Sequence, residues 1–140
     1  MSETYVELKN RQQAEFNKFP LGFAFSNSQF KEMMEKWGLK ETDTDKIYSI
    51  GSGGYIRKSD HATFHEMSDR HSKEFNQAIA EDKTGEGFIY QMFLYELNNH
   101  EYGYTGDESD TLDALGYTEK DINSDERLLH GLKKAMRDAS

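Results

Sequence analysis

The segment that most constrains the fold is residues 88–97, FIYQMFLYEL, in which eight of ten side chains are apolar or aromatic. On a helical wheel these side chains fall on every face, and a helix that is apolar all round has to be buried. Each large apolar side chain removed from water stabilises a fold by about 1.5–3 kcal/mol. We therefore predict a central buried helix around which the rest of the chain packs.

The length and the cysteine content narrow the classes of protein to consider. A chain of 140 residues has the usual size of one domain, so we expect a single domain over residues 1–140. The absence of cysteine excludes a disulfide, a thiolate nucleophile and a cysteine-ligated metal. The first residues carry no secretory signal, and the longest apolar run is too short to span a bilayer. We predict a soluble, cytoplasmic protein.

Negative charge is concentrated in one segment. The net charge is −9, and residues 101–126 contain nine acidic side chains against the single Lys120. Residues 1–60, in contrast, carry nine acidic and nine basic side chains. A surface of this sign repels phosphate groups. We therefore expect neither direct binding to nucleic acid nor binding to a membrane.

Two amphipathic helices are predicted near the amino terminus. Residues 4–19 carry apolar side chains at near-helical spacing, and Pro20 ends the pattern. In the next segment Ser26 and Gln29 form a capping-box pattern, and Gly38 is the glycine expected after a helix carboxyl terminus. We predict the second helix between these two signals.

Further helices are predicted in the second half of the chain. A third amphipathic helix begins after Ser59 or Asp60, and its apolar stripe continues to Ile79. After the buried segment comes a polar turn, then short helical pieces, and Asn123 with Glu126 forms a capping pattern that opens the last helix.

Three short segments are typical of strands: residues 23–25, 47–50 and 55–57. The last two flank a glycine-rich turn, which predicts a hairpin. Together these patterns predict an α+β fold, mostly α. We expect a single compact domain with a central buried helix, surrounding amphipathic helices and a small antiparallel sheet of two or three strands.

One group of residues offers the chemistry of a small-molecule pocket. Tyr55 and Arg57 lie in the predicted hairpin, and His100, Glu101 and Tyr102 follow the buried helix. These side chains can bind a ligand, and His100 with Glu101 can act as an acid–base pair. In the alternative interpretation, the imidazole satisfies the last carbonyls of the helix and the tyrosines pack their rings. No nucleophile elbow or catalytic triad is present, so we assign no catalytic residue.

His61 and His65 lie four residues apart on a predicted helix, a spacing that allows two imidazoles to bind one metal ion. A metal site needs a third and usually a fourth ligand, and no further spacing supplies them. We therefore predict no metal site and no cofactor.

Four carboxylates after the buried helix form a candidate partner-binding surface: Asp107, Glu108, Asp110 and Asp113. Their order does not match the alternating oxygen ligands, central glycine and closing glutamate of a calcium-binding EF-hand loop. We interpret them as a surface for a protein partner.

Four segments together resemble a family of small uncharacterised proteins carried by phages and other mobile elements of gut and Gram-positive bacteria: FAFSNSQF, IYSIGSGGYIRKSD, MFLYELNNHEYGYTGD and TLDALG. The family has no established activity and no catalytic residue to transfer. The resemblance implies the bacterial cytoplasm and mobile DNA as the setting, in which small acidic proteins act by binding host proteins.

We therefore predict a non-enzymatic accessory protein of a bacterial mobile element that binds an unidentified host protein through its acidic surface. A sharper form of this hypothesis is a DNA mimic, in which carboxylates take the place of phosphates on a nucleic-acid-binding protein. The alternative from another class is a small-ligand-binding protein or enzyme, with a pocket near the hairpin and the turn after the buried helix.

Overall fold

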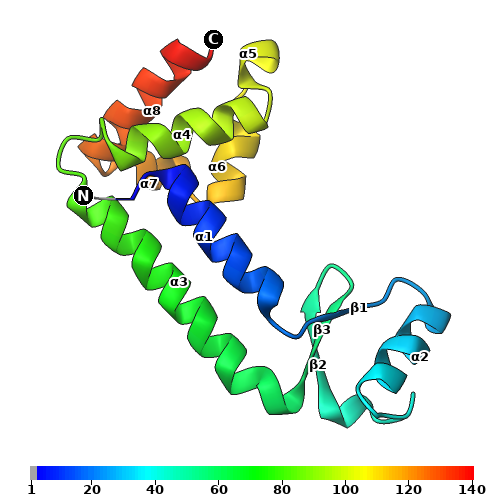
Figure 1. The fold of residues 1–140 in the computed structure, drawn as a ribbon. Coiled ribbons are helices and arrows are strands. Elements are labelled where there is room, and N and C mark those ends of the chain that lie inside the picture. Colours follow the sequence, from blue (N-terminus) through cyan, green and yellow to red (C-terminus); the bar gives the residue numbers. More distant parts are fainter. Residues whose placement is uncertain (1–2) are drawn as a thin grey trace. The chain divides into compact units, whose positions relative to one another are not determined.

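A computed structural model of the protein describes residues 3–140. These residues form eight α-helices and a sheet of three short strands (Figure 1). The helices are α1 (Tyr5–Lys18), α2 (Asn27–Lys36), α3 (His61–Glu81), α4 (Phe88–Asn99), α5 (Tyr102–Thr105), α6 (Ser109–Leu115), α7 (Glu119–Asn123) and α8 (Glu126–Ala139). The strands are β1 (Gly22–Phe23), β2 (Ile47–Gly51) and β3 (Gly54–Arg57). The predicted α+β class, mostly α, is confirmed.

The chain forms two compact units. The first consists of residues 3–13 together with Lys73–Ser140, and the second is Ala14–Ser72. Helices α1 and α3 each contribute residues to both units. The single domain over residues 1–140 stays a prediction.

Helix α4 is the centre of the first unit, as the sequence predicts. Four of its side chains, those of Ile89, Met92, Phe93 and Leu97, are completely buried. Helix α8 packs along it and contributes three further buried residues: Leu128, Leu132 and Ala135. Helices α1, α6 and α7 contribute four more: Tyr5, Leu8, Leu112 and Ile122. The apolar interior of this unit is therefore assembled around one helix.

The prediction that this helix is buried on every side is wrong in one respect. Tyr95 is 39% exposed, and Tyr90 and Leu94 are only partly buried. The Tyr90 hydroxyl donates to the Asp138 carboxylate, and the Lys134 ammonium lies 4.7 Å from the centre of the Tyr90 ring. A tyrosine can pack its ring while its hydroxyl stays at the surface, so these positions close the edge of the core.

The start of α8 packs closely on the turn before α4. Gly85 has φ +86°, and a Cβ atom there would lie 2.2 Å from the Arg127 carbonyl oxygen. The Arg127 guanidinium donates to the carbonyls of Ile79 and Asp82, at 2.8 and 2.7 Å. Only glycine combines this backbone conformation with so close an approach.

The sheet and α2 form the interior of the second unit. The strand order is β1-β3-β2, and both pairings are antiparallel. Ile56 in β3 is 1% exposed, and Met33 and Met34 from α2 are buried with Ala24. The predicted hairpin is confirmed, whereas the strand predicted at residues 23–25 lies at Gly22–Phe23.

The signals at the ends of α2 act largely as predicted. The Ser26 hydroxyl accepts from the Gln29 amide at 3.2 Å, although the Gln29 side chain accepts from Phe25 and not from Ser26. At the other end Gly38 has φ +71°, and the Leu39 amide donates to the Met34 carbonyl at 2.8 Å. This is the Schellman pattern that a glycine after a helix predicts.

Two expectations near the carboxyl terminus are wrong. The polar segment predicted as a turn contains the short helix α5, which is enclosed by left-handed residues at Glu101 and Gly106. Helix α8 is capped by Asp125, whose side chain accepts from the Arg127 amide, because Asn123 is already the last residue of α7. Within residues 3–140, no helix has both the length and the apolarity that a membrane span requires.

Candidate functional site

The predicted partner-binding residues lie on the segment that connects α5 to α6 and on α6 itself. We call Asp107, Glu108, Asp110 and Asp113 the acidic surface. Asp107, Asp110 and Asp113 are exposed, and Glu108 is half-buried. Neighbouring buried positions in α6, Thr111 and Leu112, pack toward the core of the first unit. The alternation of buried and exposed positions therefore leaves Asp110 and Asp113 at the surface of α6.

The four carboxylates differ in what they contact. Asp107 accepts from the Ser109 amide at 2.9 Å and from the Ser109 hydroxyl at 2.5 Å. These two donors hold the pKa of Asp107 below its ordinary value. Within the described part of the chain, no cation pairs with Glu108, Asp110 or Asp113. Three carboxylates, two of them exposed, therefore have no counter-charge, and this is the charge pattern that a basic surface complements.

A highly exposed aromatic ring lies in α5, the helix that precedes the acidic surface in the sequence. Tyr104 is 93% exposed, the largest exposure among the large hydrophobic side chains of residues 3–140. It belongs to α5, whose preceding residue Glu101 has φ 58°, an uncommon conformation for a residue other than glycine. A Cβ atom at Gly103 would lie 2.6 Å from the Ala139 carbonyl oxygen, so the backbone of α5 lies close against the end of α8.

A shallow hollow of about 490 Å³ lies beside that ring. It is lined by Tyr104 itself with Asn98, Glu101, Gly103 and Ala139. An exposed tyrosine beside a hollow has the composition of a protein–protein contact, where tyrosine often contributes much of the binding energy.

The three ligand-site residues after α4 point to different places. The His100 ring lies 3.6 Å from the Glu96 carboxylate, and Glu101 lines the hollow beside Tyr104. Tyr102 lines a separate hollow, next to α8. These three side chains do not converge on one cavity within the first unit.

The two ligand-site residues of the hairpin belong to the second unit. The Tyr55 ring packs edge-on against Phe30, with centroids 5.5 Å apart. The Arg57 guanidinium donates to Asp60 at 2.9 Å and lies 5.9 Å from the centre of the Trp37 ring. A ligand-binding role for these five residues stays a prediction.

His61 and His65 lie side by side on α3, with their rings stacked at a centroid distance of 5.9 Å. Both residues are exposed. His65 is 4.0 Å from Asp69, and His61 packs against the Tyr48 ring at 4.6 Å. No group of three or more histidine, aspartate or glutamate side chains among residues 3–140 is arranged to hold a metal ion.

A buried carboxylate that the sequence analysis missed lies in the centre of the first unit. Glu96 on α4 is 4% exposed. Its Oε1 atom accepts from the Tyr5 hydroxyl at 2.9 Å and from the Lys9 ammonium at 2.8 Å, and its Oε2 atom faces His100. Burial and the Glu96 carboxylate raise the pKa of Tyr5. The sequence does contain a signal for this site, because Glu96 is the one charged residue in the largely apolar segment 88–97.

The contacts of Glu96 indicate a structural role. The Oε1 atom accepts both hydrogen bonds from α1, and the Oε2 atom lies 3.6 Å from the His100 ring. The Glu96 carbonyl also accepts from the hydroxyl of Thr111, which is completely buried. The charged side chain joins α1 to α4, while its backbone joins α4 to the helix that carries the acidic surface.

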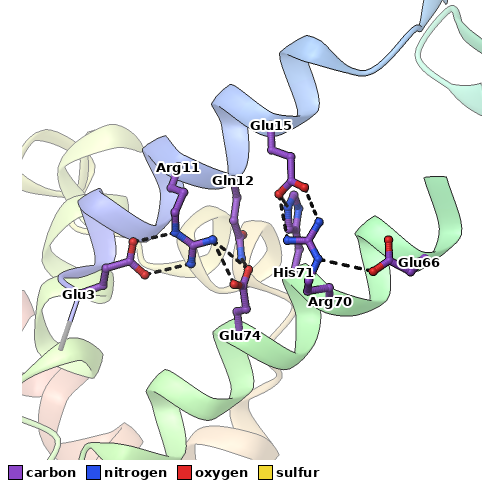
Figure 2. A network of polar contacts seen from close by, with 8 residues as sticks. All are labelled: Glu3, Arg11, Gln12, Glu15, Glu66, Arg70, His71 and Glu74. Carbon is purple, nitrogen blue, oxygen red and sulfur yellow. Dashed lines mark hydrogen bonds and ion pairs between the residues drawn. The ribbon is translucent and has the colours of Figure 1, made fainter. Parts of the chain in front are cut away.

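A further network of charged side chains involves α1 and α3 (Figure 2). In the first unit the Arg11 guanidinium donates to Glu3, at 2.8 and 3.0 Å, and to Glu74, at 3.0 and 3.3 Å. In the second unit Glu15 contacts both Arg70 and the His71 ring, the latter at 2.8 Å. Arg11 is shared by two carboxylates, and Glu15 is shared by two nitrogen-containing side chains. The geometry of such contacts is more strongly fixed than that of a single surface ion pair.

The Glu15 contacts predict a measurable titration. Hydrogen bonds from Arg70 and then His71 lower the pKa of Glu15 from 4.5 to about 2. The pairing therefore stabilises the fold above pH 4.5, and this contribution is lost as the pH falls towards about 2. We expect Arg70→Met to raise the pKa of Glu15, measured by NMR titration of its carboxyl carbon. Arg57→Met, which removes a cation elsewhere in the same unit, should leave it unchanged, and an unaltered titration in Arg70→Met would contradict the assignment.

Comparison with models of protein families gives a match over most of the chain. The model of a family of unknown function, DUF7659, matches residues 4–138. No curated protein and no solved structure shows significant similarity to the chain. Because the match covers both compact units, the acidic surface and Glu96, the chain belongs to the DUF7659 family of unknown function.

Proposed function

We propose that this protein is a non-enzymatic accessory protein of a bacterial mobile element, which acts in the cytoplasm by binding a host protein with a basic surface. The observation that carries the proposal is the 93% exposed ring of Tyr104 in the helix that precedes the acidic surface. The ring supplies apolar contact area, and the carboxylates supply the complementary charge. The resemblance of four sequence segments to proteins of mobile elements supports the setting.

The physical basis of the proposed binding has two parts. Carboxylates that lack a counter-charge attract a basic partner and speed the encounter, particularly at low salt. Tyrosine loses little conformational entropy on binding and can pack its ring while its hydroxyl stays hydrated. The net charge of −9 increases the steering at long range.

DNA mimicry is the narrower form of this proposal. Asp110 and Asp113 are exposed one helical turn apart on α6, which supports a row of negative charges. Tyr104, in contrast, has no equivalent in a phosphate backbone. We therefore place mimicry below general protein binding, and we expect a duplex DNA competitor to displace the partner only if mimicry is the mechanism.

The test is affinity capture from a lysate of the source bacterium, at low and at moderate salt. We compare the wild type with a triple variant, Tyr104→Ala with Asp110→Asn and Asp113→Asn. The matched control combines Phe25→Ala with Glu35→Gln and Asp45→Asn, which removes one exposed ring and two exposed carboxylates from the second unit.

The expected result is a basic protein that the wild type and the control retain and that the triple variant binds about tenfold more weakly, as for loss of an interface hot spot. Equal retention by the triple variant would contradict the proposed surface. Absence of any partner at both salt concentrations would count against protein binding itself. A gene located outside any prophage or transposon would contradict the mobile-element setting.

A further inference from the structure

A groove in the first unit has no role in the proposed binding surface. Its volume is about 550 Å³, within the range of small-molecule sites. Leu8 from α1, Ala78 from α3 and Phe88 from α4 supply apolar walls. Gln77 and Gly87 also line the groove, together with six charged side chains: Glu3, Arg11, Glu74, Glu81, Asp82 and Lys83.

The charged groups of the groove are not equally available to a ligand. The Arg11 guanidinium is already held by the carboxylates of Glu3 and Glu74. Asp82 accepts from the backbone amides of the turn that follows it. Lys83 donates to the Ala80 carbonyl at 3.2 Å, at the end of α3. Both cations of the groove are therefore engaged.

Glu81 differs from the other carboxylates of the groove. Its side chain accepts from the Gln77 amide at 3.0 Å, and no cation pairs with it among residues 3–140. It is also the last residue of α3, a helix of 21 residues whose carboxyl terminus carries the negative end of the helix dipole. Four carboxylates against two cations leave the groove with a formal charge of −2. The potential at this site therefore favours a positive ligand.

We propose that this groove binds a small amphipathic cation. The apolar body of the ligand packs against Leu8, Ala78 and Phe88, and its ammonium group pairs with Glu81. An anionic ligand would have to displace a carboxylate from Arg11 and approach the unpaired charge of Glu81. A neutral ligand would use the apolar walls alone.

The experiment uses three probes with the same body and different head groups: phenylbutylammonium, phenylbutanol and phenylbutyrate. Binding to the full chain is measured at neutral pH by isothermal titration calorimetry and by chemical-shift changes at the Leu8 and Ala78 methyl groups. We expect the cation to bind about fivefold more tightly than the alcohol, the upper limit for an exposed ion pair. We expect the carboxylate to bind most weakly.

Two variants separate the charge from the cavity. Glu81→Gln should remove the preference for the cation over the alcohol, while Glu119→Gln, the same change on α7, should leave it intact. Ala78→Trp should fill the groove and weaken all three probes, provided that circular dichroism shows a folded chain. Failure of all three probes to bind would overturn the proposal. Equal binding of the cation and the carboxylate would also overturn it, as would an unchanged preference for the cation in Glu81→Gln. Glu81 is exposed, so this substitution tests the charge without disturbing the core.

Discussion

Replacing Asp82 with alanine is expected to lower the free energy of unfolding by about 3 kcal/mol, because several hydrogen bonds to one carboxylate are lost together. The Asp82 carboxylate accepts from the backbone amides of Thr84 at 3.2 Å, Gly85 at 2.9 Å, Gly87 at 3.1 Å and Ile89 at 3.0 Å. Gly87 is the N-cap residue of α4 and has no side chain to act as acceptor. Asp82 therefore caps the central helix from outside it.

The pH dependence gives the Asp82 prediction a second readout. Burial acts to raise the pKa of Asp82, but the backbone amides outweigh it and hold the pKa below its ordinary value of 3.8. The stabilisation is therefore complete above pH 3.8 and is lost as the pH falls through the lower pKa of the folded state. The stability difference between wild type and Asp82→Ala should shrink below that pH.

Urea unfolding followed by circular dichroism measures this effect. The control is Asp45→Ala, an exposed aspartate in the second unit, which should change the free energy of unfolding by less than about 0.5 kcal/mol. Asp82→Asn keeps one acceptor oxygen, so its free energy of unfolding should lie between those of the wild type and Asp82→Ala. A change at Asp82 as small as the control would show that solvent replaces the carboxylate as acceptor.

Replacing Lys9 with methionine is expected to lower the free energy of unfolding by about 2 kcal/mol, because it leaves a buried carboxylate without its nearest cation. The Lys9 ammonium lies 2.8 Å from Glu96, whose side chain is 5% exposed. Lys9 itself is 41% exposed, so the loss is smaller than for a pair buried on both sides. Its ammonium also lies 4.9 Å from the centre of the Tyr95 ring.

A double variant isolates the electrostatic part of the Lys9 prediction. Glu96→Gln in the Lys9→Met background removes the unpaired charge and retains an acceptor for the Tyr5 hydroxyl, so it should restore more than half of the lost stability. The control is Lys31→Met, since Lys31 lies 3.9 Å from Glu41 and both side chains are exposed. If Lys9→Met lowers the free energy of unfolding no more than Lys31→Met does, the pair of Lys9 and Glu96 does not stabilise the fold.

Asp82 and Glu96 also affect the segment that carries the proposed binding surface. Asp82 stabilises the start of α4, and Glu96 lies near its end, where the carbonyl of Glu96 contacts Thr111 of α6. Tyr104 of α5 and the carboxylates of α6 follow that end in the sequence. The acidic surface is therefore positioned by the central helix, although none of its residues belongs to the apolar core.

Local sequence signals predicted most of the secondary structure. Ser26 caps α2, and Gly38 ends it. The glycine-rich turn joins β2 to β3 in the predicted hairpin. These features depend on hydrogen bonds within a few residues, so the sequence contains all the partners that they need.

The amino-acid sequence by itself determined the class of the fold, the apolar character of α4 and the acidic segment after it, because periodicity, capping residues and charge are local properties. Only the tertiary structure decided which polar groups are satisfied. Glu96 meets Tyr5 and Lys9, which lie 91 and 87 residues away in the sequence. The apolar walls of the groove likewise come from three separate helices. Such partners are selected by packing, and packing brings together residues whose spacing along the chain follows no repeat.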